Sequence, residues 1–300
     1  MNNCNVTVII PTYQRLSQLL QSLEKILECN PKPDEIIIHI DSNDNETDRG
    51  LRDYLDNSKI QEIKREIKII TIKNSFHVGP GGGRNIAIEQ AKNSIVASFD
   101  DDSYPLDRDY FQRLINIFAD FPEAAVVSAK IFHINEEITP STSSARWVSD
   151  FVGCGCAYRQ EVFKQTAGYV SLPVAYGMEE VDLSLRLHDL GWKILESSNL
   201  RVFHNTQLEH HNNPKITAAS IANLMLLTYL RYPVVLWWLG IAQCMNRIIW
   251  LVKYGRTSGI LAGIFTIPNL IQHHYHLRHA ISYKSLISYL HLRKNPICIQ

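Results

Sequence analysis

Three consecutive carboxylates, Asp100, Asp101 and Asp102, are the residues whose types and spacing most directly suggest chemistry. They follow residues 95–99, an uncharged apolar run that predicts a short buried strand. Neighbouring carboxylates repel one another, and a hard divalent cation such as Mg²⁺ or Mn²⁺ relieves that repulsion while keeping positions open for substrate phosphates. Because aspartate is also common in solvated turns, the run alone is compatible with either a metal site or an acidic turn.

A second acidic cluster contains Glu179, Glu180 and Asp182, ahead of an apolar helical pattern. Asp182 follows Glu179 by three residues, so these two share a helix face and Glu180 points elsewhere. Acids in a first helical turn also stabilise the helix itself, so capping is the alternative to catalysis. Farther along, residues 192–195 and 200–203 predict two short strands, the second ending at His204.

A glycine-rich segment, residues 79–85, ends in Arg84 and Asn85. It lacks the Gly-Lys-Ser/Thr of a phosphate-binding P-loop and the third glycine of the dinucleotide pattern. Its small residues, a guanidinium and the start of a helix at 86–91 would suit an anion such as a diphosphate. A plain flexible turn is the alternative.

These motifs need a scaffold, and the chain between them alternates predicted strands and helices. Apolar runs at 6–10, 35–40, 67–72 and 124–129 predict strands buried in a parallel sheet, with helices from 16 to 27 and from 110 to 118. The carboxyl ends of parallel strands meet at one sheet edge, so we expect a nucleotide-sized crevice there. Asp41 would contact a base or ribose, or cap a helix. Residues 133–149 predict a loop and 151–158 a glycine-containing strand.

Charge is distributed unevenly along this neutral chain of 300 residues. Residues 1–210 hold all 30 acidic residues and 21 of the 30 Lys and Arg, whereas residues 211–300 hold nine Lys and Arg and no acid. This asymmetry indicates a functional division. Since a core strand already begins at Val6, we expect no signal peptide. The cysteines lack metal-ligand spacing and predict reduced thiols in a cytoplasmic protein; they are Cys4, Cys29, Cys154, Cys156, Cys244 and Cys298.

The basic region after residue 212 is densely apolar from Leu224 to Ile241, but Arg231 and Pro233 interrupt this run and Arg247 interrupts its continuation. We therefore expect no clean span of about 20 apolar residues. Basic residues beside tryptophans and without acids favour helices lying in a membrane interface. An oligomerisation or capping subdomain is the alternative, and four histidines between residues 273 and 279 have no acid or cysteine near them to complete a metal site.

Taken together, the order of these motifs resembles glycosyltransferase family 2, whose members have the GT-A fold. The resemblance covers residues 5–210 and implies a Rossmann-like mixed α/β sheet flanked by helices, with a GT-A catalytic domain at 1–212 and a C-terminal helical region at 213–300. It rests on Val8–Tyr13, Asp41-Ser42, Asn74 with Gly79–Asn85, Phe99–Asp102, Glu179–Leu187, Gly191-Trp192 and Val202–His204.

The resemblance also implies roles for individual residues. Asp102 and Asp100, with His204, are expected to bind Mn²⁺ or Mg²⁺. Glu180 lies where the family usually has an aspartate as catalytic base, and Glu179 is the alternative. For the nucleotide sugar we predict contacts from Pro11, Thr12, Arg15, Asp41, Gly81, Arg84, Asn85, Asp100 and Asp101. For the acceptor we predict Gly153, Cys154, Gly155 and Asp182.

The function implied is inverting, metal-dependent transfer from a UDP- or dTDP-sugar to a hydroxyl of a polysaccharide or glycolipid of the cell envelope. We expect a cytoplasmic enzyme bound peripherally to the inner face of the membrane through residues 215–300, without a nucleic-acid partner; an oligomer is possible. A sugar-1-phosphate nucleotidyltransferase is one alternative, although Arg15 is the only basic residue near the first strand for pyrophosphate departure. A non-catalytic membrane adaptor is the other.

Overall fold

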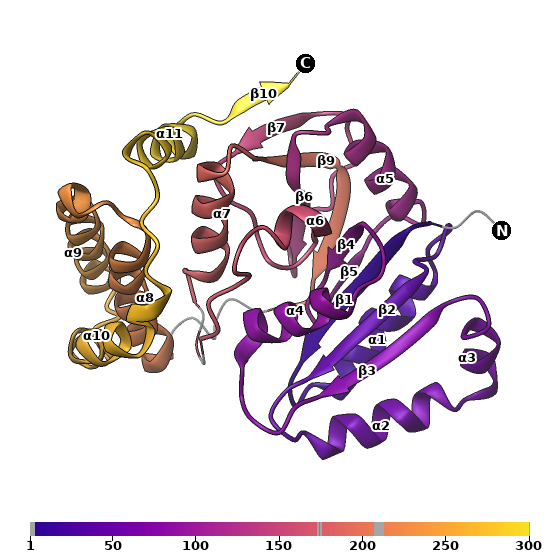
Figure 1. Cartoon of the computed structure of the whole chain (residues 1–300). Helices are drawn as coiled ribbons and strands as arrows, with labels where there is room; N and C mark the ends of the chain where they lie inside the picture. The colour runs from indigo at the N-terminus through magenta and orange to yellow at the C-terminus, as the bar shows by residue number, and fades with distance from the viewer. Residues whose placement is uncertain (1–3, 173, 175, 207–212, 300) are drawn as a thin grey trace.

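The computed structural model describes residues 4–172, 174, 176–206 and 213–299, and one long mixed sheet organises them (Figure 1). The strand order is β10-β7-β9-β6-β8-β4-β1-β2-β3, with β5 paired to β9. The strands are β1 (Val6–Thr12), β2 (Glu35–Ile40), β3 (Lys68–Lys73), β4 (Ile95–Ser98), β5 (Ser103–Pro105), β6 (Ala124–His133), β7 (Ala145–Val148), β8 (Cys156–Arg159), β9 (Lys193–His204) and β10 (Ile297–Ile299).

Four neighbouring strands, β4, β1, β2 and β3, are parallel, as their apolar runs predict, and β3 is an edge of the sheet. Their side chains alternate between the two faces, so that Ile36 and Ile38 enter one core cluster and Ile37 enters the other. Helices α1 (Leu16–Leu27) and α5 (Tyr110–Asp120) cover the first face. Helices α4 (Gly79–Gln90), α6 (Gln160–Phe163) and α7 (Glu179–Asp189) cover the second.

Several local predictions were wrong. The glycine-rich segment is not a loop, because α4 already begins at Gly79. The two strands predicted between 192 and 204 form one strand, β9, with a register irregularity against β6. The strand predicted at 151–158 is shorter and ends one residue later, because β8 spans Cys156–Arg159. The stretch predicted as a loop at 133–149 contains β7, and residues after β2 form α2 (Asn45–Leu55) and α3 (Ser58–Ile63).

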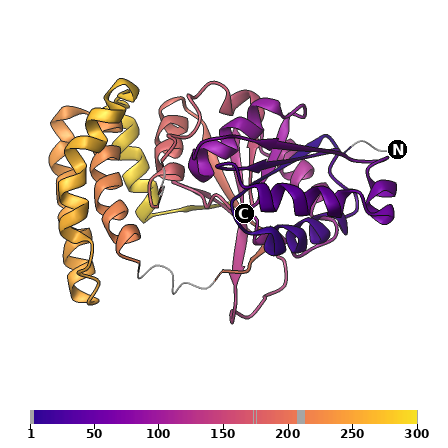
Figure 2. The ribbon, with the colours of Figure 1, turned by 90° about the horizontal axis from the view of Figure 1, so that it is seen from below.

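The C-terminal residues form a helical region beside the sheet, with α7 between the two (Figure 1). It contains α8 (Pro214–Arg231), η2 (Val234–Leu236), α9 (Trp237–Lys253), α10 (Ile260–His274), η3 (Tyr275–Leu277) and α11 (Tyr283–Lys294). Leu226 and Leu230 of α8 and Leu286 of α11 form a core cluster with Met178 and Leu185 at α7. The chain then returns to the sheet, where β10 pairs antiparallel with β7 (Figure 2). The predicted domain boundary at 212/213 adjoins residues 207–212, which lie outside the described residues, and it stays a prediction.

We expected no clean apolar span of membrane length in this region, but one helical stretch is long and apolar enough to qualify as one. Within the described chain, the single helical stretch Val234–Lys253 has a mean hydropathy of 1.4 over a membrane-length window, of which 22% is buried. One such helix is weak support for a spanning segment, since an apolar surface helix meets the same test.

Candidate active site

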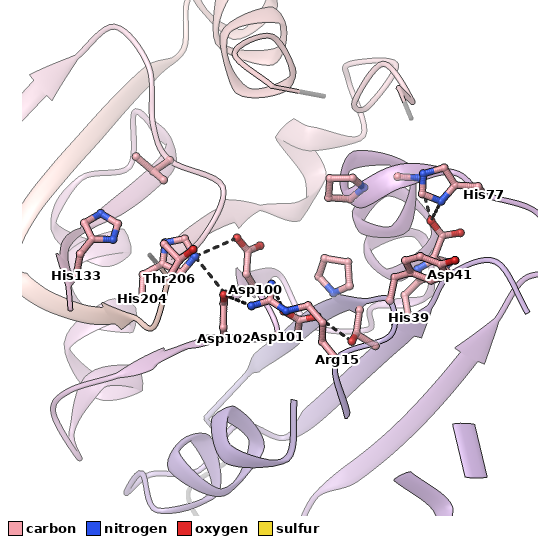
Figure 3. A pocket seen from close by; sticks show the side chains of 16 residues that line it. Arg15, His39, Asp41, His77, Asp100, Asp101, Asp102, His133, His204 and Thr206 are labelled. Atoms are coloured by element: carbon pink, nitrogen blue, oxygen red, sulfur yellow. Dashed lines mark hydrogen bonds and ion pairs between the residues drawn. The ribbon is translucent and has the colours of Figure 1, made fainter. Parts of the chain in front are cut away.

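A cavity of about 590 Å³ opens where β1, β2 and β4 end (Figure 3). This is the sheet edge at which the sequence predicts a crevice. Eight of the predicted site residues line it: Pro11, Thr12, Arg15, Asp41, Asp100, Asp101, Asp102 and His204. In Figure 3 the three aspartates and His204 lie on one side of the cavity and Asp41 lies on the other.

The turn after β4 fixes the three aspartates in different environments. Asp101 points into the fold, where its Oδ2 accepts a hydrogen bond from Thr12 Oγ1 at 2.9 Å. Burial raises the pKa of Asp101 to about 7, although the charge of Arg15 opposes this. Asp100 remains about one-third exposed, while Asp102 is almost completely buried. Asp100 and Asp102 therefore present oxygens toward His204, and Asp101 holds the turn.

His204 completes this cluster from the end of β9. Its Nε2 lies 3.1 Å from Asp102 Oδ1 and 4.0 Å from Asp100 Oδ2, and its Nδ1 lies 3.5 Å from the Cys154 thiol. Burial disfavours the imidazolium, but the bond to Asp102 and the charge of Asp100 raise the pKa of His204 overall. The Cys154 contact holds the ring so that Nε2 faces the carboxylates.

These residues fit a divalent cation. Asp102 Oδ1 is buried and faces His204 Nε2 at 3.1 Å, so a carboxylate oxygen and an imidazole nitrogen lie together as candidate ligand atoms. Among the described residues, one group presents three possible ligand atoms within 4.8 Å of one another, and it is Asp100, Cys154 and His204. Burial raises the pKa of the Cys154 thiol well above its usual range, so this sulfur stays protonated. Two carboxylates and an imidazole remain, a set that suits Mn²⁺ or Mg²⁺.

Arg15 covers the aspartates from the loop after β1. Its Nη1 lies 3.0 Å from Asp101 Oδ1, and its Nη2 bonds Asp102. The side chain is 41% exposed and therefore free to turn toward a phosphate in the cavity. Arg15 is thus a counter-charge for the aspartates, and its predicted role in holding the donor stays a prediction.

At the opposite side of the cavity, Asp41 caps the start of α4. Its carboxylate accepts hydrogen bonds from the backbone N–H groups of Val78 and Gly79, and His77 Nδ1 lies 2.8 Å from its Oδ2. The carboxylate also lines the cavity, so the helix-capping and ligand-binding alternatives coexist at this residue.

Arg84 connects the aspartates to the glutamate pair of α7. It is 3% exposed, donates from Nη2 to Asp100 and from Nε to Ser98 Oγ, and its Nη1 lies 3.9 Å from Glu179 Oε2. Burial alone would lower the pKa of Arg84, but the negative charge of Asp100 helps to raise it well above its usual range. The two acidic clusters, about 80 residues apart in sequence, therefore meet around one buried cation.

The two glutamates are not equivalent. Glu179 is almost fully buried and its Oε1 accepts the backbone N–H of Gly81 at 3.1 Å; burial and then Glu180 raise its pKa to about 8. Glu180 is half-buried, and its Oε1 lies against Gly153 so closely that a Cβ there would be 2.4 Å from it. Burial raises the pKa of Glu180, while Arg84 opposes the shift. Glu179 fastens α4 to α7. Glu180 is the less buried of the two and lies beside Gly153 and Arg84, but neither glutamate lines the cavity at the aspartates.

Some predicted site residues lie elsewhere. Asn85 does not line the cavity, because its amide brackets the backbone N–H and C=O of Tyr169. Asp182 is fully buried and bound by Arg186 and Arg231, so it ties α7 to α8 and does not line this cavity. Gly81, Gly155 and Arg84 are buried beneath the site. The sequence analysis missed Tyr13, His39, His77, His133, Val152 and Thr206, which line the cavity.

The comparisons with known proteins agree with this geometry. The sequence model of glycosyl transferase family 2 matches residues 7–167, more than half of the chain. The chain belongs to glycosyltransferase family 2. Among curated proteins, none matches the sequence of this glycosyltransferase.

Solved structures share the fold of this glycosyltransferase at low identity. The mannosyltransferase PcManGT from Pyrobaculum calidifontis, in complex with GDP-Man and Mn²⁺, is 14% identical with a TM-score of 0.59, covering 97% of this chain and 87% of that one. GalNAc-T7 with UDP, GalNAc and Mn²⁺ is 15% identical with a TM-score of 0.60, covering 78% and 49%. S. aureus TarS 1-349 is 15% identical with a TM-score of 0.53, covering 85% and 73%. The predicted GT-A fold is confirmed.

Proposed function

We propose that this glycosyltransferase moves a sugar from a UDP- or dTDP-sugar to a hydroxyl group of a saccharide or glycolipid, with inversion at the anomeric carbon. The observation that carries the proposal is the junction at Arg84, which brings Asp100 and the pair Glu179 and Glu180 to one site. A donor diphosphate at the aspartates would have its sugar directed toward Gly153 and Glu180.

In this proposal Asp100, Asp102 and His204 hold a divalent cation, which when bound neutralises the diphosphate leaving group. The Glu180 carboxylate accepts the proton of the attacking hydroxyl on the face of the sugar opposite the diphosphate. Arg84 keeps Asp100 oriented and favours the ionised form of Glu180, since the two side chains meet at Gly153. Arg15 turns from the aspartates to the phosphates.

The choice of donor rests on the structural neighbours, whose complexes contain UDP-GlcNAc for TarS, UDP for GalNAc-T7 and GDP-Man for PcManGT. We propose that the donor carries a pyrimidine base, and a GDP-sugar, as in the PcManGT complex, is the competing hypothesis. The nucleotidyltransferase stays the alternative function, because Arg15, its only basic candidate near β1, would have to leave the same two aspartates to meet a pyrophosphate.

A panel of UDP-, dTDP- and GDP-sugars, each with Mn²⁺, Mg²⁺ or EDTA, tests the proposal. We expect at least one pyrimidine sugar to raise the unfolding temperature only with metal and to be hydrolysed slowly without acceptor. Stabilisation by GDP-sugars alone would overturn the proposed base. Pyrophosphate formation from a sugar phosphate and a nucleoside triphosphate would favour the nucleotidyltransferase.

We further propose that the helical region binds the inner face of the cytoplasmic membrane and brings a lipid-linked acceptor to the site. Helices α9 and α10 both pack on α8 and expose apolar side chains that no other described element covers. Residues 211–300 carry nine Lys and Arg and no acid, which complements anionic lipid. The exposed apolar residues are Trp238, Ile241, Met245, Ile249, Leu261 and Phe265.

Flotation of the full-length protein with phosphatidylglycerol vesicles tests the membrane proposal. Phe265 is 78% exposed and Ile249 is 60% exposed, so proteins with Phe265→Glu or Ile249→Glu should still fold. The negative charge should lower the fraction of protein that floats with the vesicles at least about threefold. Ile138→Glu, on the catalytic domain at 45% exposure, is the matched control. Equal flotation of all variants would contradict membrane binding through α9 and α10.

A further inference from the structure

A second cavity, of about 790 Å³, lies between the catalytic domain and the helical region. Residues 165–171 and the end of α7 form one wall, and the end of α10 with η3 and the following residues forms the other. It shares no lining residue with the cavity at the aspartates. The proposed transfer reaction uses none of its residues.

The walls of this cavity carry an excess of positive charge. Arg186, Arg231 and Arg278 line it, and the nearby carboxylates are Asp189 in the lining and Asp182 behind it. Three guanidinium groups against two carboxylates leave one uncompensated positive charge. Four histidines for which the sequence suggested no function also line the cavity: His273, His274, His276 and His279.

Two of these guanidinium groups have a buried N–H without an acceptor. Arg186 directs Nε and Nη2 to Asp182 and Nη2 also to Gly168 O, but its Nη1 has no partner among the described residues. Arg278 stacks on Tyr229 and Trp237, and its Nη1 is likewise buried and unpaired within the described chain. Buried donors without acceptors are rare in native proteins and call for an explanation.

These features favour an anion as the ligand of this cavity. The described histidines of this cavity do not bring three ligand atoms together, so they do not form a metal site. Guanidinium forks match the tetrahedral oxygens of phosphate. The cavity is much larger than one phosphate, and Val170, Leu190 and Leu277 add apolar wall.

We propose that this cavity binds a phosphate group carried by a larger molecule, with Arg186 and Arg278 as its principal donors. The phosphate can belong to a lipid headgroup or to a soluble phosphate ester, and both present the same oxygens. This site is separate from the donor site and does not depend on the transfer reaction.

Leu190 provides the sharpest test, because it lines the cavity and is 51% exposed. Leu190→Glu places a carboxylate at the wall without disturbing the core. Leu190→Gln is the control for shape, and Tyr283→Glu, on an exposed residue outside the cavity, is the control for added charge. Arg278→Gln, paired with Lys284→Gln on the exposed face of α11, gives an independent second variant.

Binding is measured in EDTA, to silence the donor site, with inorganic pyrophosphate by calorimetry and with phosphatidylcholine vesicles that contain or lack phosphatidic acid. We expect Leu190→Glu and Arg278→Gln to weaken binding at least about tenfold, and the three controls less than about threefold.

The two probes distinguish the source of the phosphate. A selective loss with pyrophosphate supports a soluble ester, and a selective loss confined to phosphatidic acid vesicles supports a lipid headgroup. Unchanged binding of both probes by Leu190→Glu and Arg278→Gln, with unfolding temperatures like that of the unmodified protein, overturns the proposal. Losses of equal size in Tyr283→Glu and Lys284→Gln also overturn it, because they reduce the effect to general surface charge.

Discussion

Glu180→Gln is expected to lower kcat by about 10²- to 10⁴-fold while the nucleotide sugar still binds. Glutamine keeps the size of the side chain beside Gly153 but cannot accept the proton of the acceptor hydroxyl. The donor contacts that we propose come from other residues, at the aspartates, so the metal-dependent shift in unfolding temperature should persist. Initial rates and thermal shifts with the same donor measure the two quantities separately.

The pH profile gives an independent signature of the same residue. Burial raises the pKa of Glu180, and a general base works only when it is ionised. The rate of the unmodified enzyme should therefore fall as the pH drops through this raised pKa, at a pH above that of an ordinary glutamate. In Glu180→Gln the residual rate should lose this step.

Glu179→Gln is the matched control for this prediction. Its Oε1 can still accept the N–H of Gly81, so α4 and α7 stay joined and turnover should change far less than in Glu180→Gln. An inactive Glu179→Gln beside an active Glu180→Gln would assign the base to Glu179 instead.

Asp102→Asn is expected to reduce activity by at least about 10²-fold and to abolish stabilisation by Mn²⁺ with donor. The change removes the charge of a buried carboxylate whose Oδ1 faces His204 Nε2 at 3.1 Å and which we propose as a metal ligand. It also leaves His204 and Arg15 with one counter-charge fewer. Thermal shifts with Mn²⁺ and donor, together and separately, provide the measurement.

Asp109→Asn, on an aspartate that is 53% exposed before α5, is the control, and it should bind metal and donor normally. A full Mn²⁺-dependent shift in the unfolding temperature of Asp102→Asn would contradict the assignment of Asp102 as a metal ligand. Adding EDTA to the unmodified enzyme should reproduce the loss seen in Asp102→Asn, and Mn²⁺ should reverse it.

The strands that support the site were predictable because their local and tertiary preferences agree. The run 35–40 is β2 in full, and Lys68–Lys73 is displaced by one residue from its prediction. Isoleucine-rich β-branched runs bounded by polar residues leave few alternatives to a strand once a sheet forms. The polar residues after these strands, such as Asp41 and Asp100, consequently also lie at the predicted edge.

The glycine-rich segment was predicted wrongly because local preference and packing disagree. Glycine disfavours helices, yet the segment forms the start of α4, where Gly81 and Gly83 let the helix pack closely against its neighbours. A Cβ at Gly83 would be 2.5 Å from His39 Nδ1, and one at Gly81 would be 2.3 Å from Glu179 Oε1. These contacts join residues up to 98 positions apart, so propensity along the chain cannot reveal them.

Long-range pairing also explains the missed cavity residues. His133 is the register partner of His204 because β6 and β9 run parallel, and 71 residues separate them in sequence. Its position at the end of an apolar run was the available signal. Asp182 is the opposite case. It was predicted at the acceptor because it is close to Glu179 and Glu180 in sequence, but the turn of α7 directs its side chain to Arg231.

The pairing of β10 with β7 makes the helical region an insertion within the sheet rather than an appendage at its end. Both of its chain connections lead to sheet strands, and its core packs on α7, the helix that begins with Glu179 and Glu180. Deleting residues from 215 onward would strip an edge strand and uncover Leu185, so truncated proteins are poor reporters of what these helices do. Any displacement of these helices, for instance on contact with a surface, would act on α7 and hence on the glutamate that we propose as the base.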